Sequence, residues 1–398
     1  MRVIVNQSTA LGARTGIGHY TLDLVDALRA ESPSDSFDLF PPTWWGVVQR
    51  WASSWRAGKT TPTSVSNDCS WTGSLLGHLR ALGERALAGC LYMTTWWNRY
   101  DLYHEPNYIP LPSSLPTVAT IHDLSVLLHP EWHPADRVDY YARRFEEGLS
   151  RCSHLLAVSE FTRHEAIHVL GIPPERITCT YNGVRPGLRP LPPTEWEPVT
   201  RRLGLPASYL LFVGTIEPRK NPLMLMKAYC DLPASVRERC PLVLAGAWGW
   251  NADEFARYFD DVARHRQVIQ LGYVANDDLP ALYSAARALV FPSFYEGFGL
   301  PPLEMMACGG AVLASTAGAV AEVVGAKAHG IDAADLPAWR DAMHRVIVDD
   351  DWRHHLREGV TEHARAFTWE RCAHGTLAVY RKVLGLNSIS DAAHRLAA

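Results

Sequence analysis

Residues 294–304 have the sequence FYEGFGLPPLE, and this stretch decides the fold prediction. The apolar run 288–292 comes just before it and predicts a buried strand. Gly297 and Gly299 allow the backbone to approach a ligand closely, and Pro301 suits the first turn of a helix. A strand, a glycine turn and a helix in this order direct amide N–H groups and the positive helix end toward an anion.

Two glutamates bracket this turn. Glu296 lies on the turn itself, and Glu304 follows one turn into the expected helix. A carboxylate can accept two hydrogen bonds at once, which suits vicinal hydroxyls. The spacing alone would commonly belong to two solvated glutamates. Together with the anion-binding geometry, it predicts a sugar-nucleotide site with these donor-binding residues: Glu296, Gly297, Phe298, Gly299, Leu300 and Glu304.

A second motif lies upstream. The apolar run 209–213 predicts a strand, and GTIEPRKN follows it directly at residues 214–221. Arg219 and Lys220 therefore lie beyond the carboxyl end of a strand, where a diphosphate would fit. Arg219 can bond two phosphate oxygens at once, and Lys220 can act as a point charge. With Gly214, these two cations extend the predicted donor site.

These two motifs resemble, in order and spacing, the carboxyl-terminal domain of the retaining GT-B glycosyltransferases of family 4. The resemblance covers nearly the whole chain, through TIHD at 120–123, VSEFT at 158–162, YNGV at 181–184 and FTWE at 367–370. It implies an α/β protein with two Rossmann-like, doubly wound domains that face a central cleft. It also implies transfer with retention of anomeric configuration, by a front-face attack in which the leaving phosphate oxygen helps to take the acceptor's proton.

Strand-like and helix-like runs alternate along the chain, which predicts parallel sheets with helices on both faces. The proline-rich stretch 185–193 interrupts the alternation and is the expected interdomain linker. We predict an acceptor-binding domain over residues 1–190 and a nucleotide-sugar-binding domain over residues 191–370. Residues 371–398 are expected to form a terminal helix, which the resemblance returns to the first domain, and a tail. The expected strands and helices elsewhere are 3–6, 18–30, 117–121, 135–150, 154–158, 161–170 and 369–384.

The first domain offers a glycine loop of its own. Residues 12–18, GARTGIG, lead into an expected helix. Gly16, Ile17 and Gly18 could admit the acceptor, and Gly18 also a donor phosphate. Because residue 21 is Thr, the loop does not complete the glycine fingerprint of a dehydrogenase-type dinucleotide site.

His122 follows the apolar run 118–121 at the carboxyl edge of an expected strand, where open α/β sheets bind ligands. A structural histidine is the alternative. The resemblance places His122 beside the donor sugar, so we assign it to sugar positioning and not to general base catalysis. The predicted catalytic residues are His122, Glu296, Arg219 and Lys220.

No metal site is expected. The acidic run 349–351 lies in a polar helix-like region away from every ligand motif and is predicted to be a solvated loop rather than a metal site. Arg219, Lys220 and two helix N-termini can stabilise the charge of a leaving diphosphate without magnesium. We therefore expect no cofactor beyond the nucleotide-sugar donor.

Composition agrees with this interpretation. A chain of 398 residues, 47% hydrophobic and 20% charged, suits a two-domain globular protein. A net charge of −4 lacks the basic field that nucleic acids attract. The eight cysteines show no C-x-x-C pair and no metal-binding spacing, which predicts reduced thiols. The chain begins directly with a strand-like run and has no apolar run of spanning length, so a cytoplasmic location is expected.

The substrates are less determined by the sequence. Tyr273 lies on the segment expected near the nucleobase, but a tyrosine does not distinguish guanine from uracil. The longer context, residues 120–125, 130–134 and 214–221, resembles bacterial mannosyl- and rhamnosyltransferases of surface-polysaccharide assembly. This favours GDP-mannose over a UDP-hexose as donor. The acceptor would be a glycan, either free or carried on a polyprenyl diphosphate.

Two aromatic segments, residues 44–56 and 96–99, mix tryptophans with arginines. Such segments can lie at a membrane interface, which would make the protein peripheral on the inner face of the cytoplasmic membrane. Burial of the same tryptophans in the core is the alternative.

Two rival classes of protein stay open. A nucleotide-sugar epimerase would share the α/β alternation, although the sequence lacks its glycine fingerprint and a convincing Tyr-x-x-x-Lys pair. A noncatalytic scaffold derived from a transferase is the second, against which the intact Arg219, Lys220, Glu296 and Glu304 argue.

Overall fold

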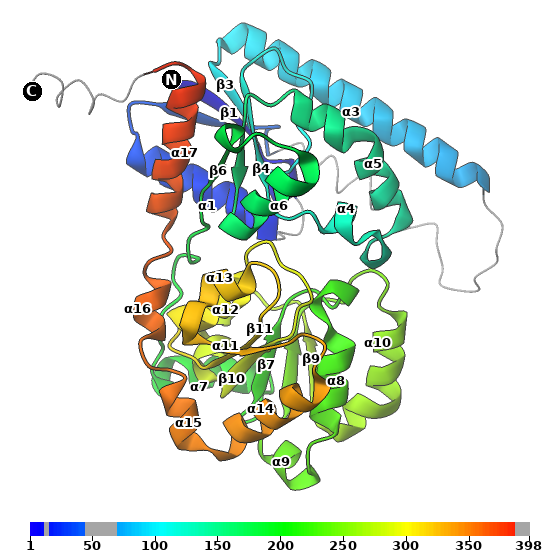
Figure 1. The fold of residues 1–398 in the computed structure, drawn as a ribbon, viewed down its shortest axis with the longest axis vertical. Coiled ribbons are helices and arrows are strands. Elements are labelled where there is room, and N and C mark those ends of the chain that lie inside the picture. Colours follow the sequence, from blue (N-terminus) through cyan, green and yellow to red (C-terminus); the bar gives the residue numbers. More distant parts are fainter. Residues whose placement is uncertain (12–15, 44–69, 387–398) are drawn as a thin grey trace, which may run out of the picture.

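The computed structural model describes residues 1–11, 16–43 and 70–386. They form two six-stranded parallel sheets, one in each half of the molecule (Figure 1). Strands buried on both faces are expected to be almost continuously apolar, and the central strands of both sheets fulfil this. The predicted α/β class with two doubly wound, Rossmann-like domains is confirmed.

The first sheet has the strand order β2-β1-β3-β4-β5-β6. Its strands are β1 (Arg2–Asn6), β2 (Ser36–Phe40), β3 (Leu102–Glu105), β4 (Thr117–Ile121), β5 (His154–Ala157) and β6 (Ile177–Cys179). The helices of this half are α1 (Gly16–Glu31), α3 (Ser70–Asn98), α4 (Ser125–Leu128), α5 (Ala135–Ser150) and α6 (Glu160–Leu170).

The second sheet has the strand order β12-β11-β10-β7-β8-β9. Its strands are β7 (Leu210–Val213), β8 (Leu242–Ala245), β9 (Val268–Gly272), β10 (Ala288–Phe291), β11 (Val312–Ser315) and β12 (His329–Ile331). The helices are α7 (Pro193–Arg202), α8 (Pro222–Cys230), α9 (Ala234–Arg239), α10 (Asp253–Tyr258), α11 (Leu279–Ala285), α12 (Leu300–Ala307), α13 (Val320–Val324), α14 (Leu336–Val348), α15 (Asp350–His355) and α16 (Val360–Ala364).

The strand order of the second sheet reverses between β7 and β10, which are hydrogen-bonded neighbours. Open α/β sheets bind ligands outside the carboxyl ends of the strands at such a reversal. The loops that leave β7 and β10 carry the two sequence motifs, residues 214–221 and 294–299. The topology therefore brings both motifs to the place where this fold binds ligands.

The core of the second domain shows why its sheet is covered on both faces. Along β7, Leu211 packs into one hydrophobic cluster, whereas Leu210 and Phe212 pack into another on the opposite face. Successive side chains of a strand point to opposite faces, so both faces of this sheet are buried against apolar side chains. The predicted strands and helices agree with the structure to within two residues at each end.

The last helix, α17 (Trp369–Val383), lies against α1 of the first domain (Figure 1). A buried chain of hydrogen bonds fixes it there. The hydroxyl of Tyr380 lies 2.6 Å from His104 Nδ1, and His104 Nε2 lies 2.9 Å from the hydroxyl of Thr120. Tyr20 on α1 extends the chain, with its hydroxyl 3.1 Å from that of Thr120. Helix α17 thus connects the end of the second domain to the interior of the first.

Candidate active site

The two motif loops meet in a buried cluster of charges beyond β7 and β10. Lys220 Nζ lies 2.6 Å from Glu296 Oε1, and Arg219 Nη1 lies 2.8 Å from Glu296 Oε2. Glu217, from the same loop as the two cations, binds Arg219 Nη2 at 3.0 Å. The Ser293 hydroxyl donates to Glu296 Oε1 at 3.0 Å. The structure therefore brings together three of the four predicted catalytic residues.

The charges in this cluster balance one another. Burial opposes ionisation of Glu296, but the neighbouring Arg219 and Lys220 outweigh it and lower the pKa of Glu296 from 4.5 to about 2. Burial disfavours the charge of Arg219 as well, yet Glu296, Asp123 and Glu217 raise the pKa of Arg219. Glu296 and Arg219 are therefore both ionised at neutral pH. The cluster thus offers two cations, which can pair with phosphate oxygens, and a carboxylate, which can accept hydrogen bonds from hydroxyls.

Glu304 lies on α12 and is only 1% exposed. The Tyr283 hydroxyl donates to its Oε2 at 2.7 Å, and Arg185 Nη2 lies 2.9 Å from its Oε1. Arg185 also donates to Asn276 Oδ1 at 2.9 Å. Both carboxylate oxygens of Glu304 therefore face protein groups, so a ligand hydroxyl would have to share or replace them.

Gly297 and Gly299 form the turn between the two glutamates. A Cβ at Gly297 would lie 1.6 Å from the carbonyl oxygen of His122, so no larger residue fits. The Gly297 carbonyl accepts hydrogen bonds from the hydroxyls of Ser159 at 2.7 Å and Thr162 at 3.2 Å. Gly299, the N-cap residue just before α12, has φ +91°, a conformation that favours glycine. The turn thus binds directly to the carboxyl edge of the first sheet.

His122 lies at that edge, at the end of β4. Its ring packs edge-on against Tyr20 with centroids 4.8 Å apart, and its Nε2 lies 2.7 Å from the carbonyl oxygen of Pro106. Because a carbonyl can only accept, Nε2 carries the proton and Nδ1 keeps its lone pair. Burial lowers the pKa of His122 to about 4. A neutral imidazole of this kind can orient a hydroxyl and is a poor acid at neutral pH.

The other predicted residues lie on α1 and on the loop after β9. Gly16, Ile17 and Gly18 form the first turn of α1. The loop after β9 approaches that helix, since Asn276 Nδ2 lies 3.4 Å from His19 Nε2. Tyr273 is on this loop and is 66% exposed. The candidate nucleobase segment and the candidate acceptor turn therefore lie near each other.

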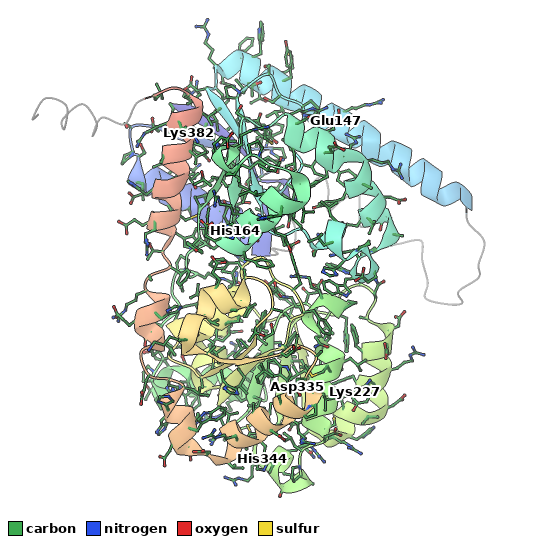
Figure 2. The ribbon with its side chains drawn as sticks, viewed as in Figure 1. Glu147, His164, Lys227, Asp335, His344 and Lys382 are labelled. Atoms are coloured by element: carbon green, nitrogen blue, oxygen red, sulfur yellow. The ribbon has the colours of Figure 1, made fainter. Side chains whose placement is uncertain are left out.

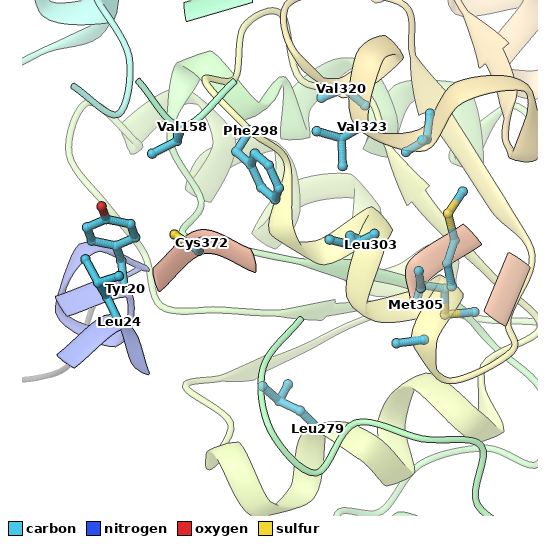
Figure 3. Close-up of a cluster of buried hydrophobic side chains, with 14 of the residues drawn as sticks. Tyr20, Leu24, Val158, Leu279, Phe298, Leu303, Met305, Val320, Val323 and Cys372 are labelled. Atoms are coloured by element: carbon cyan, nitrogen blue, oxygen red, sulfur yellow. The ribbon is translucent and has the colours of Figure 1, made fainter. Parts of the chain in front are cut away.

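Phe298 differs from the expected picture of a ligand contact. Its side chain lies in one buried cluster with Val158 of the first domain and Val320 of the second, as Figure 3 shows. The rings of Tyr181 and Phe367 have centroids 6.4 and 6.0 Å from the ring of Phe298. Only the backbone of Phe298 is left for a ligand. Leu300 begins α12, and Gly214 follows β7 with φ +146°.

Several contacts between the domains were not predicted from the sequence. Glu322 on α13 accepts hydrogen bonds from the backbone N–H groups of Glu160 and Phe161 at 2.9 and 2.8 Å, which caps α6 across the interface. Tyr295, next to Glu296, accepts from the Leu124 N–H at 3.1 Å and donates to Glu165. The turn that carries Glu296 is therefore joined to the first domain through Tyr295, and α13 is joined to it through Glu322.

The acidic run 349–351 was wrongly expected to be a loop. Asp349 is the N-cap of α15 and accepts from the Trp352 N–H, and Asp350 pairs with Arg287 at 2.7 Å. Over residues 1–11, 16–43 and 70–386, no group of three or more His, Cys, Asp or Glu is placed to hold a metal ion. The described cysteines are free thiols, and Cys69 lies outside the described residues.

Comparison with known proteins identifies the family. A family model described as "Glycosyl transferases group 1" matches residues 202–363, and one described as "Glycosyltransferase Family 4" matches residues 14–188. The O-antigen chain mannosyltransferase B of Escherichia coli is 36% identical over 375 residues, which cover 92% of this chain and 96% of the relative.

Two further matches extend this result. The serotype-specific mannosyltransferase WbdA of Escherichia coli is 30% identical over 282 residues, which cover 69% of this chain and 34% of the relative. The crystal structure of Anabaena HepE in complex with UDP-glucose aligns with a TM-score of 0.67 at 19% identity, over 95% of this chain and 100% of that one. The fold, the two motifs and these likenesses agree, and the chain belongs to the family 4 glycosyltransferases of the GT-B fold.

Proposed function

We propose that this glycosyltransferase moves a mannosyl group from GDP-mannose to a glycan acceptor during surface-polysaccharide synthesis, with retention of configuration. The observation that carries the proposal is the convergence of Arg219, Lys220 and Glu296 beyond β7 and β10. The likeness to a mannosyltransferase over 96% of that relative's length supports mannose as the sugar. The glycan would be free or linked to a polyprenyl diphosphate.

The predicted site residues each have a proposed part in the reaction. Arg219 and Lys220 would bind the diphosphate and stabilise the charge that grows on it as the glycosidic bond breaks. Glu296 would accept hydroxyls of the transferred sugar, and Glu304 those of the ribose. His122 would orient a sugar hydroxyl through its Nδ1 lone pair. The leaving phosphate oxygen would help to take the acceptor's proton, so no side chain need act as base.

A nucleotide panel tests the donor assignment. GDP should raise the Tm of the protein, whereas UDP, dTDP and NAD should raise it less, because only a ligand of the native state stabilises it. At about 100 times its Kd, GDP should add about 2.7 kcal/mol to the free energy of unfolding. Mannose transfer from GDP-mannose should also persist in EDTA.

Other outcomes of the panel would replace the proposal with a named alternative. A larger Tm shift with UDP would favour a UDP-hexose donor. Binding of a nucleotide without transfer to any glycan would favour the noncatalytic scaffold. Complete loss of activity in EDTA, restored by magnesium, would contradict the proposed metal independence.

We also propose that the C-terminal end of α3 contacts a lipid surface. Trp96 and Trp97 are 65% and 77% exposed, and Tyr92 and Met93 one turn earlier are each 56% exposed. Tryptophan and tyrosine side chains favour the membrane–water interface. The other predicted segment, residues 44–56, lies outside the described residues. Within the described part of the chain, no helix has the length and apolar character needed to span a bilayer.

The protein should therefore co-sediment with anionic liposomes, and salt should weaken the association by screening arginines such as Arg99. Replacing Trp96 and Trp97 together with serine should abolish most of the binding. Trp248→Ser, which changes a 37% exposed tryptophan of the second domain, is the matched control. Equal sedimentation of the double variant and the wild type would contradict this contact.

A further inference from the structure

A cavity of about 480 Å³ lies beside the two motif loops, at the boundary of the two domains. Trp132, in the short helix Pro130–Trp132, lines it from the first domain. From the second domain, it is lined by Phe294, by Met224 on α8 and by Leu336 on α14. Ligand pockets in proteins typically enclose about 300–1,000 Å³, so this cavity has the size of a binding site.

Two aromatic rings of the cavity wall are held nearly parallel. The rings of Trp132 and Phe294 have centroids 6.1 Å apart and an interplanar angle of 16°. The ring of His129 stacks on Trp132 with centroids 3.9 Å apart, and the Trp132 carbonyl accepts from Trp250 Nε1 at 2.8 Å. Phe294 keeps 38% of its surface exposed. The exposed ring of Phe294 beside the held ring of Trp132 offers an apolar aromatic surface of the kind on which the C–H face of a pyranose can pack.

The polar side chains of the cavity offer hydrogen bonds with little net charge. Lys227 on α8 (Figure 2) and Glu254 on α10 contribute one charge of each sign, and Asn251 adds an amide. Arg219 and Lys220, the two cations proposed to bind the diphosphate, are not among the described residues that line the cavity. An anionic nucleotide or phosphate is therefore a poor match to this lining. A neutral molecule with many hydroxyls matches both its rings and its polar groups.

The cavity also lies close in the chain to the reaction centre. Phe294 precedes Glu296 by two residues, and its N–H donates to the carbonyl of Arg219 at 2.8 Å. Pro218, which also lines the cavity, precedes Arg219. The motif loops thus carry the donor residues and one wall of the cavity together.

We infer that this cavity binds a sugar unit of the acceptor glycan. That unit is not the one that receives the transferred sugar but one further along the acceptor chain. The inference rests on the proposed function and adds to it a preference for an extended acceptor over a monosaccharide. The additional stacking and hydrogen bonds would hold a growing chain in place. They would not touch the donor.

Kinetics with two acceptors test this subsite. Phe294→Ala should lower kcat/KM for a manno-oligosaccharide acceptor about tenfold, because stacking on the ring is lost. The value for methyl mannoside and the affinity for GDP should stay at wild-type levels. Met224→Trp, which fills the cavity from α8, should have the same selective effect. Trp248→Ala is the matched control, since Trp248 has a similar exposure of 37% and does not line the cavity.

The possible failures are distinguishable. If the wild type neither binds GDP nor transfers mannose, the proposed function itself is wrong. If the wild type is active but both cavity variants lower kcat/KM equally for the two acceptors, the subsite inference is wrong. Weaker GDP binding by both variants would assign the cavity to the donor and also overturn the inference.

Discussion

Replacing Lys220 with alanine is expected to lower the rate of sugar transfer by about 30- to 1000-fold and to weaken GDP binding. A charged hydrogen bond that strengthens as the diphosphate leaves is worth about 2–4 kcal/mol, which corresponds to this range. Arg219→Ala should have an effect of the same order, because Arg219 contacts the other oxygen of the same carboxylate. Initial rates measured beside GDP titrations give both quantities.

The matched control for this prediction is Lys382→Ala. Lys382 is an exposed lysine on α17 (Figure 2), and its Nζ donates to the backbone carbonyl of Glu175. The change removes one positive charge without touching the cluster, so rate and GDP affinity should be unaffected. Wild-type turnover in both Arg219→Ala and Lys220→Ala would contradict the assignment of the diphosphate site.

The pH at which the Lys220→Ala variant unfolds in acid is a second test of the Lys220–Glu296 ion pair. The folded protein holds the pKa of Glu296 near 2, below its ordinary value of 4.5. A depressed carboxyl pKa stabilises the folded state above the ordinary pKa, and this stabilisation is lost as the pH falls toward about 2. Without Lys220, burial of Glu296 is less compensated and its pKa rises. The variant should therefore begin to unfold at a higher pH than the wild type.

The sequence allowed the position of this cluster to be predicted, but not its internal pairing. Residues 209–213 and 288–292 are apolar runs that end in glycine-containing loops, so two buried strands with ligand-facing loops followed from local patterns. That β7 and β10 are neighbours is a property of the topology. The ion pairs of Lys220 and Arg219 with Glu296 depend on that neighbourhood, and no local pattern specifies them.

Contacts between residues far apart in the sequence explain why other features of the site could not be predicted. Glu304 meets Tyr283 from α11 and Arg185 from the stretch that was expected to be only a linker. Glu322 caps a helix that begins 162 residues earlier in the chain. By contrast, Asp349 could have been recognised, because an aspartate directly before a helical run commonly serves as an N-cap.

Separate substitutions of the two glutamates should affect different kinetic constants. Glu296→Gln should lower kcat strongly, by roughly 30- to 1000-fold, with a modest change in GDP affinity. The transferred sugar gains positive charge in the transition state, so a nearby carboxylate stabilises that state more than the bound substrate. Glu304→Gln should mainly weaken binding of the donor and of free GDP, because the ribose does not change during the reaction. The opposite pattern would mean that the donor binds in the reverse orientation, with its ribose at Glu296 and its sugar at Glu304.

The burial of Glu304 makes this comparison sharper. Glutamine keeps the size of the side chain and an oxygen for the Tyr283 hydroxyl, but it removes the charge that pairs with Arg185. Breaking a buried ion pair on one side typically costs about 3–5 kcal/mol of stability, so the Tm of Glu304→Gln must be measured beside its GDP affinity. A lower Tm with unchanged GDP affinity would make Glu304 a structural residue that ties α12 to Arg185. A lower affinity at an unchanged Tm would place the ribose at Glu304, and the same carboxylate would then exchange a protein partner for a ligand hydroxyl when the donor binds.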